Sequence, residues 1–174
     1  MRIVFTLLFS ILFNGGYSQI KTYENLIFEG AGIRGIAYSG VLKELERSGV
    51  IKNIGKVGGT SAGAVTALML SLGYNSKEIF EIIYKTEFQK FNDGKFIFFG
   101  GFSRLSKRYG WYKGNELTSW LEKIIKTKTG NSDITFKELE LKGYKRLYVT
   151  STCLNKQKLL VFSSETYPQM KIKD

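Results

Sequence analysis

Two glycine-rich turns constrain the fold of this chain more than any other feature, because each lies between a short apolar run and a helix-like segment. The first turn, residues 29–35, follows the apolar residues 26–28 and precedes a segment, 36–47, with apolar residues at helical spacing. The second turn follows a short strand predicted at 54–57 and precedes an apolar helix predicted at 64–72. Gly49 and Gly73 come where glycine commonly ends a helix. This alternation predicts a three-layer α/β sandwich with both turns at the same edge of the sheet.

The second turn has the spacing of a nucleophile elbow, Gly59-x-Ser61-x-Gly63. In such an elbow a sharp strand-to-helix turn lifts the serine hydroxyl above the sheet, and small neighbours are needed because strand and helix nearly touch. Ser61 also starts the predicted helix, where free N–H groups and the helix dipole stabilise negative charge. We therefore predict that Ser61 is a nucleophile. An ordinary glycine-rich turn with a serine cap is the alternative.

The first turn has two interpretations. Its glycines leave backbone N–H groups unobstructed at the start of a helix, which suits an oxyanion hole for Ser61. The spacing Gly30-x-Gly32-x-x-Gly35 also matches the dinucleotide-binding fingerprint, which needs an acidic residue about 20 positions further on. Residues 51–56 offer only lysine and asparagine there. We therefore favour the oxyanion hole.

Taken together, the two turns resemble the patatin-like phospholipase family. That family opens with a strand and an (Asp/Ser/Glu)-Gly-Gly-Gly-x-Arg/Lys-Gly loop, and it carries a Gly-x-Ser-x-Gly elbow at the next strand–helix turn. Residues 29–35 fit the loop, with Ala31 in place of the middle glycine, and residues 59–63 fit the elbow. The resemblance runs from about residue 26 to the end of the chain. It implies hydrolysis of a lipid acyl ester in lipid catabolism, with phospholipid as the substrate class.

The resemblance also implies a role for each motif residue. Ser61 would attack the ester carbonyl, and backbone N–H groups would bind the oxyanion. The residues implied for the oxyanion hole are Gly30, Ala31, Gly32 and Ala62. The remaining motif residues, implied to hold the two turns in shape, are Ile33, Arg34, Gly35, Gly59, Thr60 and Gly63. No cofactor and no metal are expected.

The composition limits the choice of catalytic base. The 174 residues include no histidine and a single cysteine, Cys153, which excludes a Ser-His-Asp or Cys-His mechanism, an internal disulfide and a zinc ribbon. The family uses a Ser-Asp dyad, whose aspartate lies in an Asp-Gly-Gly/Ala motif. Asp93 comes too early and is followed by Gly-Lys, Asp133 lies in a loop between helices, and Asp174 ends the chain. We expect the dyad aspartate beyond residue 174, and this chain alone to be inactive and marginally folded.

The first 18 residues have the pattern of a secretory signal peptide. Arg2 gives a positive start, residues 3–13 form an apolar run, and small residues precede Gln19. The apolar run is shorter than the ~20 residues that a helix needs to cross a bilayer. We expect export, with residues 19–174 as the N-terminal part of a patatin-like domain. A retained N-terminal anchor is the alternative.

The net charge of +11 favours anionic partners. Aromatic and basic residues alternate between positions 80 and 112, which suits an anionic membrane surface, although core aromatics under a solvated basic face would look the same. No nucleic-acid recognition motif accompanies them. We expect an acyl-lipid substrate, peripheral membrane contact and no nucleic acid. A secreted lipid- or membrane-binding module without catalysis is the second functional hypothesis.

The rest of the chain predicts three helices and a pair of strands. The first helix covers about 76–88. The second begins with Asn115 as its cap, carries an apolar stripe that serves packing, and ends at Gly130. Thr135-x-x-Glu138 is a capping box that opens the third helix, and residues 145–152 and 157–163 predict two strands.

Overall fold

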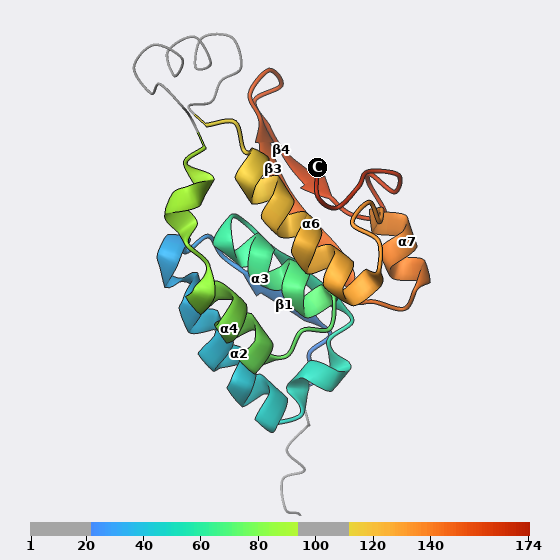
Figure 1. Ribbon diagram of the computed structural model, residues 1–174. Coiled ribbons are helices and arrows are strands. Elements are labelled where there is room, and N and C mark those ends of the chain that lie inside the picture. Colours follow the sequence, from blue (N-terminus) through green and yellow to red (C-terminus); the bar gives the residue numbers. More distant parts are fainter. Residues whose placement is uncertain (1–21, 94–111) are drawn as a thin grey trace, which may run out of the picture.

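The computed structural model describes residues 22–93 and 112–174, in which four strands form one mixed sheet (Figure 1). Strands β1 (Asn25–Phe28), β2 (Lys56–Gly59) and β3 (Arg146–Cys153) are parallel and adjacent in that order. Strand β4 (Lys158–Phe162) pairs antiparallel with β3 at the edge. The predicted signal peptide and most of the aromatic and basic segment lie outside the described residues.

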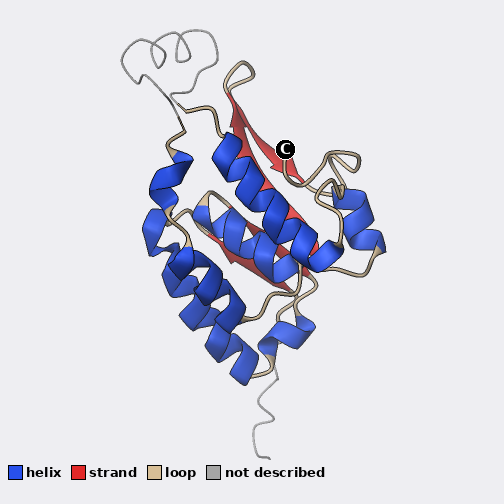
Figure 2. Cartoon of the chain, viewed as in Figure 1, coloured by secondary structure: helices blue, strands red, loops and turns tan. Residues whose placement is uncertain are grey.

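The helices lie together on one side of the strands (Figure 2). Because the chain steps from β1 to β2 to β3 in one direction and such crossovers are right-handed, the connecting helices belong on the same face. The helical elements in chain order are η1 (Gly32–Ile36), α2 (Ala37–Arg47), η2 (Val50–Asn53), α3 (Ala62–Ser71), α4 (Ser76–Lys85), η3 (Phe88–Phe91), α6 (Asn115–Thr129) and α7 (Phe136–Leu141).

The two faces of the sheet differ sharply in exposure. Phe28, Val57 and Leu147 share the face that packs against the helices, and all three are buried. On the opposite face Ile27 is 70% exposed and Leu159 is 68% exposed. The α/β class predicted from the sequence is confirmed. The described residues form the sheet and one helical layer, which are two of the three predicted layers.

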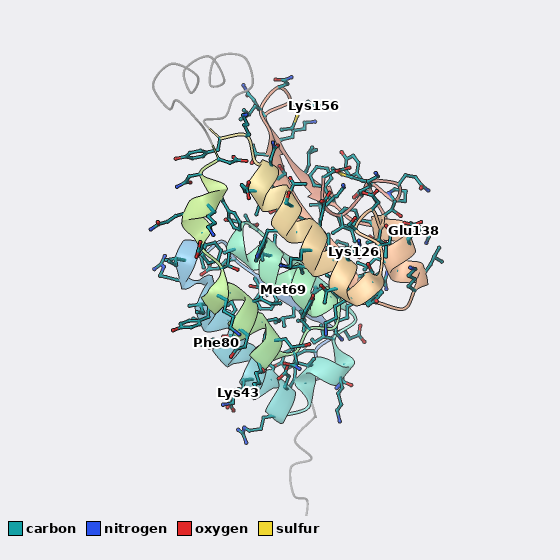
Figure 3. The ribbon with its side chains drawn as sticks, viewed as in Figure 1. Lys43, Met69, Phe80, Lys126, Glu138 and Lys156 are labelled. Atoms are coloured by element: carbon teal, nitrogen blue, oxygen red, sulfur yellow. The ribbon has the colours of Figure 1, made fainter. Side chains whose placement is uncertain are left out.

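Helix α3 is the centre of the core. It contacts all three parallel strands as well as α4, and its side chains are apolar on nearly every side, as in a helix surrounded by protein. Met69 of α3 is fully buried and lies in the middle of the molecule in Figure 3, whereas Lys43 and Lys156 lie at the periphery. The core therefore lies directly behind the elbow that carries Ser61.

Most element boundaries agree with the sequence-based predictions within two residues. The left-handed backbone of Gly49, Gly73 and Gly130 lies just after α2, α3 and α6, as predicted. β2 begins two residues late, because Ile54 turns into the core and the N–H groups of Gly55 and Lys56 both donate to the Glu24 carbonyl, at 2.8 and 3.1 Å.

Two further boundaries lie nearer the site. Helix α4 ends at Lys85 rather than near residue 88, because Thr86 is extended and the chain continues into η3. Helix α3 begins at Ala62 rather than at Ala64, so the helix starts directly after Ser61.

The prediction that Asn115 caps α6 is wrong. Gly114 holds the cap position, and the Asp93 carboxylate accepts hydrogen bonds from the N–H groups of Gly114, Lys113 and Glu116 at 2.8, 2.9 and 3.1 Å. These donors, Gly114 foremost, hold the pKa of Asp93 below its usual value. Asp93 therefore ties the end of η3 to the start of α6.

Candidate active site

Both glycine-rich turns begin at the same edge of the sheet. Phe28 ends β1 and Gly59 ends β2, and the two residues are paired in register. The Thr60 N–H donates to the Phe28 carbonyl at 3.2 Å, and the Thr60 hydroxyl is hydrogen-bonded to that of Thr150 in β3. The carboxyl ends of parallel strands are where α/β proteins bind ligands. The predicted placement of the two turns at one sheet edge is confirmed.

Ser61 has a strained backbone. Its φ is 54° and its ψ is −125°, and Gln157 is the other non-glycine residue with positive φ in the part of the chain that the structure describes. Such conformations cost about 1–3 kcal/mol each and gather at functional sites. Ser61 precedes α3 but makes no side-chain capping hydrogen bond, so it is not an ordinary helix cap. Its hydroxyl is left available at the turn.

Gly59 and Gly63 allow the close contact between strand and helix that this turn requires. A Cβ atom on Gly59 would lie 2.4 Å from the Gly63 carbonyl carbon. A Cβ atom on Gly63 would lie 2.4 Å from the carbonyl oxygens of Phe28 and Glu29. These obstacles are backbone atoms, which cannot move aside as a flexible side chain would. The small residues predicted around Ser61 are therefore needed for steric reasons.

The first turn packs against the elbow. A Cβ atom on Gly30 would lie 3.5 Å from the Ser61 Cβ, and one on Gly35 would lie 3.0 Å from the Ala62 Cβ. The chain then enters η1 at Gly32, with φ at +53°. Neither η1 nor α3 has a side-chain cap, so no side chain occupies the N–H groups at the two helix starts beside Ser61.

Not every motif residue faces the turn. Arg34 is exposed, and its backbone N–H donates to the Ala31 carbonyl at 3.1 Å, which closes the loop. Ile33 is 80% exposed, although it also lines the cavity beside Ser61. The loop thus brings an unpartnered apolar side chain to the mouth of the site.

A cavity of about 400 Å³ opens beside Ser61. Its volume falls within the range usual for small-molecule sites, ~300–1,000 Å³. Apart from Ser61, its walls are glycine and apolar side chains from η1, α3, α4, η3 and α6: Gly32, Ile33, Gly35, Ile36, Ala62, Val65, Ile83, Phe88, Phe91, Leu117 and Trp120. Such a lining is suited to an alkyl chain.

The sequence did not reveal the far wall of this cavity. Leu117 and Trp120 belong to the apolar stripe of α6, which predicted packing alone. The helical period marks which side chains avoid water, and it does not separate those that touch the core from those that line a cavity. The alternation of aromatic residues after position 80 was the available signal for Phe88 and Phe91.

Two of the three aspartates of the chain are engaged away from Ser61. Asp93 caps α6, and Asp133 forms ion pairs with Lys173 and Lys171 at 2.9 and 3.3 Å. Hydrogen bonds from Lys173 and then Lys171 lower the pKa of Asp133. Within residues 22–93 and 112–174 no hydrogen bond joins a carboxylate to the Ser61 hydroxyl. Asp174 is exposed at the end of the chain.

The described residues contain no group of three His, Cys, Asp or Glu side chains that could hold a metal ion. Among those same residues, no helix is both long enough and apolar enough to cross a bilayer.

Comparison with known proteins gives a family match over most of the chain. The patatin-like phospholipase family model matches residues 26–174. Uncharacterized protein R571 of Acanthamoeba polyphaga mimivirus is 33% identical over 155 residues, covering 88% of this chain and 48% of that protein. Probable lipid hydrolase 463L of Invertebrate iridescent virus 6 is 31% identical over 153 residues, covering 87% and 51%. The chain therefore spans about half the length of these relatives.

Two solved structures share the fold. VipD from Legionella pneumophila superposes with a TM-score of 0.61 at 22% identity, over 88% of this chain and 41% of that one. ExoU from the type III secretion system of Pseudomonas aeruginosa, solved with SpcU, gives a TM-score of 0.60 at 18% identity, over 87% and 37%. At these identities the likeness shows the fold alone.

Proposed function

The chain belongs to the patatin-like phospholipase family, and on that premise we propose that it hydrolyses lipid acyl esters with Ser61 as the nucleophile. The observation that carries the proposal is the strained backbone of Ser61. Its hydroxyl makes no capping hydrogen bond, and Ser61 lies on the wall of an apolar cavity. A turn of this kind costs stability, and a purely structural loop has no need of it. The family match also favours the oxyanion hole over dinucleotide binding for the first turn.

In the proposed reaction the Ser61 Oγ attacks the ester carbonyl carbon and its proton passes to a carboxylate base. The backbone N–H groups of the Gly30–Gly32 loop and of Ala62 donate to the oxyanion, and losing one such donor typically costs about 10²–10³-fold in rate. The tetrahedral intermediate then expels the alcohol, which takes the proton, and leaves an acyl-enzyme. Water attacks this ester, releases the fatty acid and restores Ser61.

The base is proposed to be an aspartate other than Asp93, Asp133 and Asp174. Asp93 already caps the start of α6, and Asp133 already pairs with two lysines. A carboxylate whose pKa is lowered in this way is a poor proton acceptor. The relatives are about twice as long as the region they share with this chain. We place the dyad aspartate in that additional length.

The cavity supports an acyl lipid as substrate, and phospholipid is the class proposed from the family. The alkyl chain would enter between η1, α4 and α6, so that the ester meets Ser61 at the mouth. Exposed Ile33 at that mouth, together with the net charge of +11, supports peripheral contact with an anionic membrane surface.

Export is part of the proposal. The first 18 residues support a signal peptide, and hence a secreted, periplasmic or outer-membrane-associated enzyme. Intact mass of the protein recovered outside the cytoplasm tests this. A mature chain that begins at Gln19 is expected, and a chain that retains residues 1–18 would favour the anchor.

Fluorophosphonate labelling separates catalysis from the second candidate, a lipid-binding module without catalysis. That candidate is favoured by the engagement of Asp93 and Asp133 elsewhere. In protein expressed from the complete gene, we expect one alkyl fluorophosphonate adduct on Ser61, because only an activated serine reacts. Ser61→Ala should abolish the adduct, and the surface control Ser48→Ala should keep it. Lipid binding without any adduct would establish the module instead.

A further inference from the structure

The cavity beside Ser61 shares a wall with a second hollow. This larger groove, of about 710 Å³, lies between α4 and α6. Phe91 and Trp120 line both spaces, and we call these two side chains the aromatic partition. On α4, Ile83 faces the cavity and its neighbour Ile82 faces the groove. The partition is therefore a wall that the Ser61 cavity and the groove have in common.

The partition is fixed in place by a hydrogen bond and by ring packing. The Trp120 indole N–H donates to the Thr86 hydroxyl at 3.1 Å, and that hydroxyl donates to the Ile82 carbonyl at 2.6 Å. The Phe91 ring lies 5.5 Å from the Trp120 ring and 5.6 Å from the Phe88 ring. Aromatic rings at these separations attract one another. The wall is thus held from α4, η3 and α6 together.

The groove behind the partition has a charged rim over an apolar floor. Glu81 pairs with Lys85 at 2.6 Å, and Glu87 pairs with Lys90. Ile82, Ile124 and Tyr74 lie among the groove residues beneath them. An alkyl chain could extend along this floor only if the partition were removed.

We propose that the Phe91–Trp120 partition sets the length of the acyl chain that the Ser61 cavity accepts; this inference rests on the proposed function. The cavity of about 400 Å³ has room for on the order of a dozen methylene groups, if each takes ~30 Å³, the share of one water molecule in the liquid. Chains up to that length bury every added methylene. Longer chains meet the partition and must leave their ends in water.

The test is the affinity of saturated fatty acids from C6 to C18, each below its micelle concentration, measured by titration calorimetry on protein expressed from the complete gene. Affinity should rise about fourfold for each added methylene and then level off near C12. In Trp120→Ala the rise should continue by several further carbons, because the chain can enter the groove. Trp120→Phe, which keeps a ring in place, should level off close to the wild-type length.

Two other variants keep the test decisive. If Trp120→Ala does not fold, Phe91→Ala removes the other half of the partition and should also extend the rise. Tyr84→Ala changes an exposed ring on α4 that lines neither space, and it should leave the profile unchanged. An unchanged plateau in folded Trp120→Ala or Phe91→Ala would overturn the inference.

Failure of the proposed function would look different. Val65 lines the cavity and not the groove, so Val65→Phe should fill the cavity and weaken binding at every chain length. Fatty acids that bind equally well to Val65→Phe would show that the alkyl chain does not occupy the Ser61 cavity. That result would count against the acyl site itself, whatever the partition does.

Discussion

Ser61 holds a backbone conformation that glycine would adopt without strain. We predict that Ser61→Gly is more stable than Ser61→Ala by about 1 kcal/mol, because glycine relieves ~1–3 kcal/mol of strain but loses ~0.4–1 kcal/mol to its freer unfolded chain. Urea unfolding of the two variants measures the difference. Neither variant has the hydroxyl, so the comparison isolates the backbone. Equal midpoints would mean that the turn is not strained in solution.

The glycines of the elbow differ from glycines elsewhere because other backbone atoms lie against them. Gly63→Ala should destabilise the protein by about 3 kcal/mol or more, since its Cβ would lie 2.4 Å from two carbonyl oxygens. Gly40 is the matched control: it is exposed on α2, and a methyl group there would have nothing within 4 Å. Gly40→Ala should stabilise by about 0.5–1 kcal/mol. Thermal unfolding distinguishes these opposite signs, and a harmless Gly63→Ala would contradict the packing described.

At the scale of the element, local signals predicted most of the secondary structure. Glycines ended α2, α3 and α6, and the capping box at Thr135 forms both of its hydrogen bonds with Glu138. The cap of α6 could not be predicted in this way, because the carboxylate that supplies it belongs to Asp93, more than 20 positions before Glu116. For the same reason the two turns of the site were found from the sequence, while the cavity wall was not: only tertiary packing brings Trp120 to the cavity that Ser61 also lines.

The Asp93 cap makes the stability of α6 depend on pH. The folded-state pKa of Asp93 is lowered, so its stabilising effect is complete above the unfolded pKa of ~3.9 and is lost as the pH falls through the folded value. Asp93→Asn should therefore lower the urea midpoint at pH 7, and this effect should shrink as the pH falls below the unfolded pKa. Asp174→Asn, at the end of the chain, should change neither midpoint. A pH-independent effect of Asp93→Asn would contradict the charge-based account of this cap.

At the scale of the whole molecule, the described residues leave one sheet face uncovered. Ile27 and Leu159 are exposed on it, and among the described strands none pairs with the outer edge of β1. Exposed apolar faces and open sheet edges favour association. Residues 19–174 expressed alone should therefore self-associate, as seen by light scattering.

Replacing the apolar side chains on that face should reduce this association. The double variant Ile27→Thr/Leu159→Thr is expected to be more monomeric than the parent. Leu141→Thr is the matched control, because Leu141 is 73% exposed but belongs to α7 rather than to the sheet. If the control reduces association as much as the double variant, the sheet face is not its cause.

The central claim is that Ser61 carries out lipid ester hydrolysis, and release of fatty acid from phospholipid vesicles tests it most directly. In protein expressed from the complete gene, Ser61→Ala should lower kcat by a factor on the order of 10⁴ or more, because no other group can form the acyl-enzyme. Its binding to the same vesicles should persist, since the cavity and the loop are unchanged. Fatty acid release that survives in a folded Ser61→Ala variant would contradict the account.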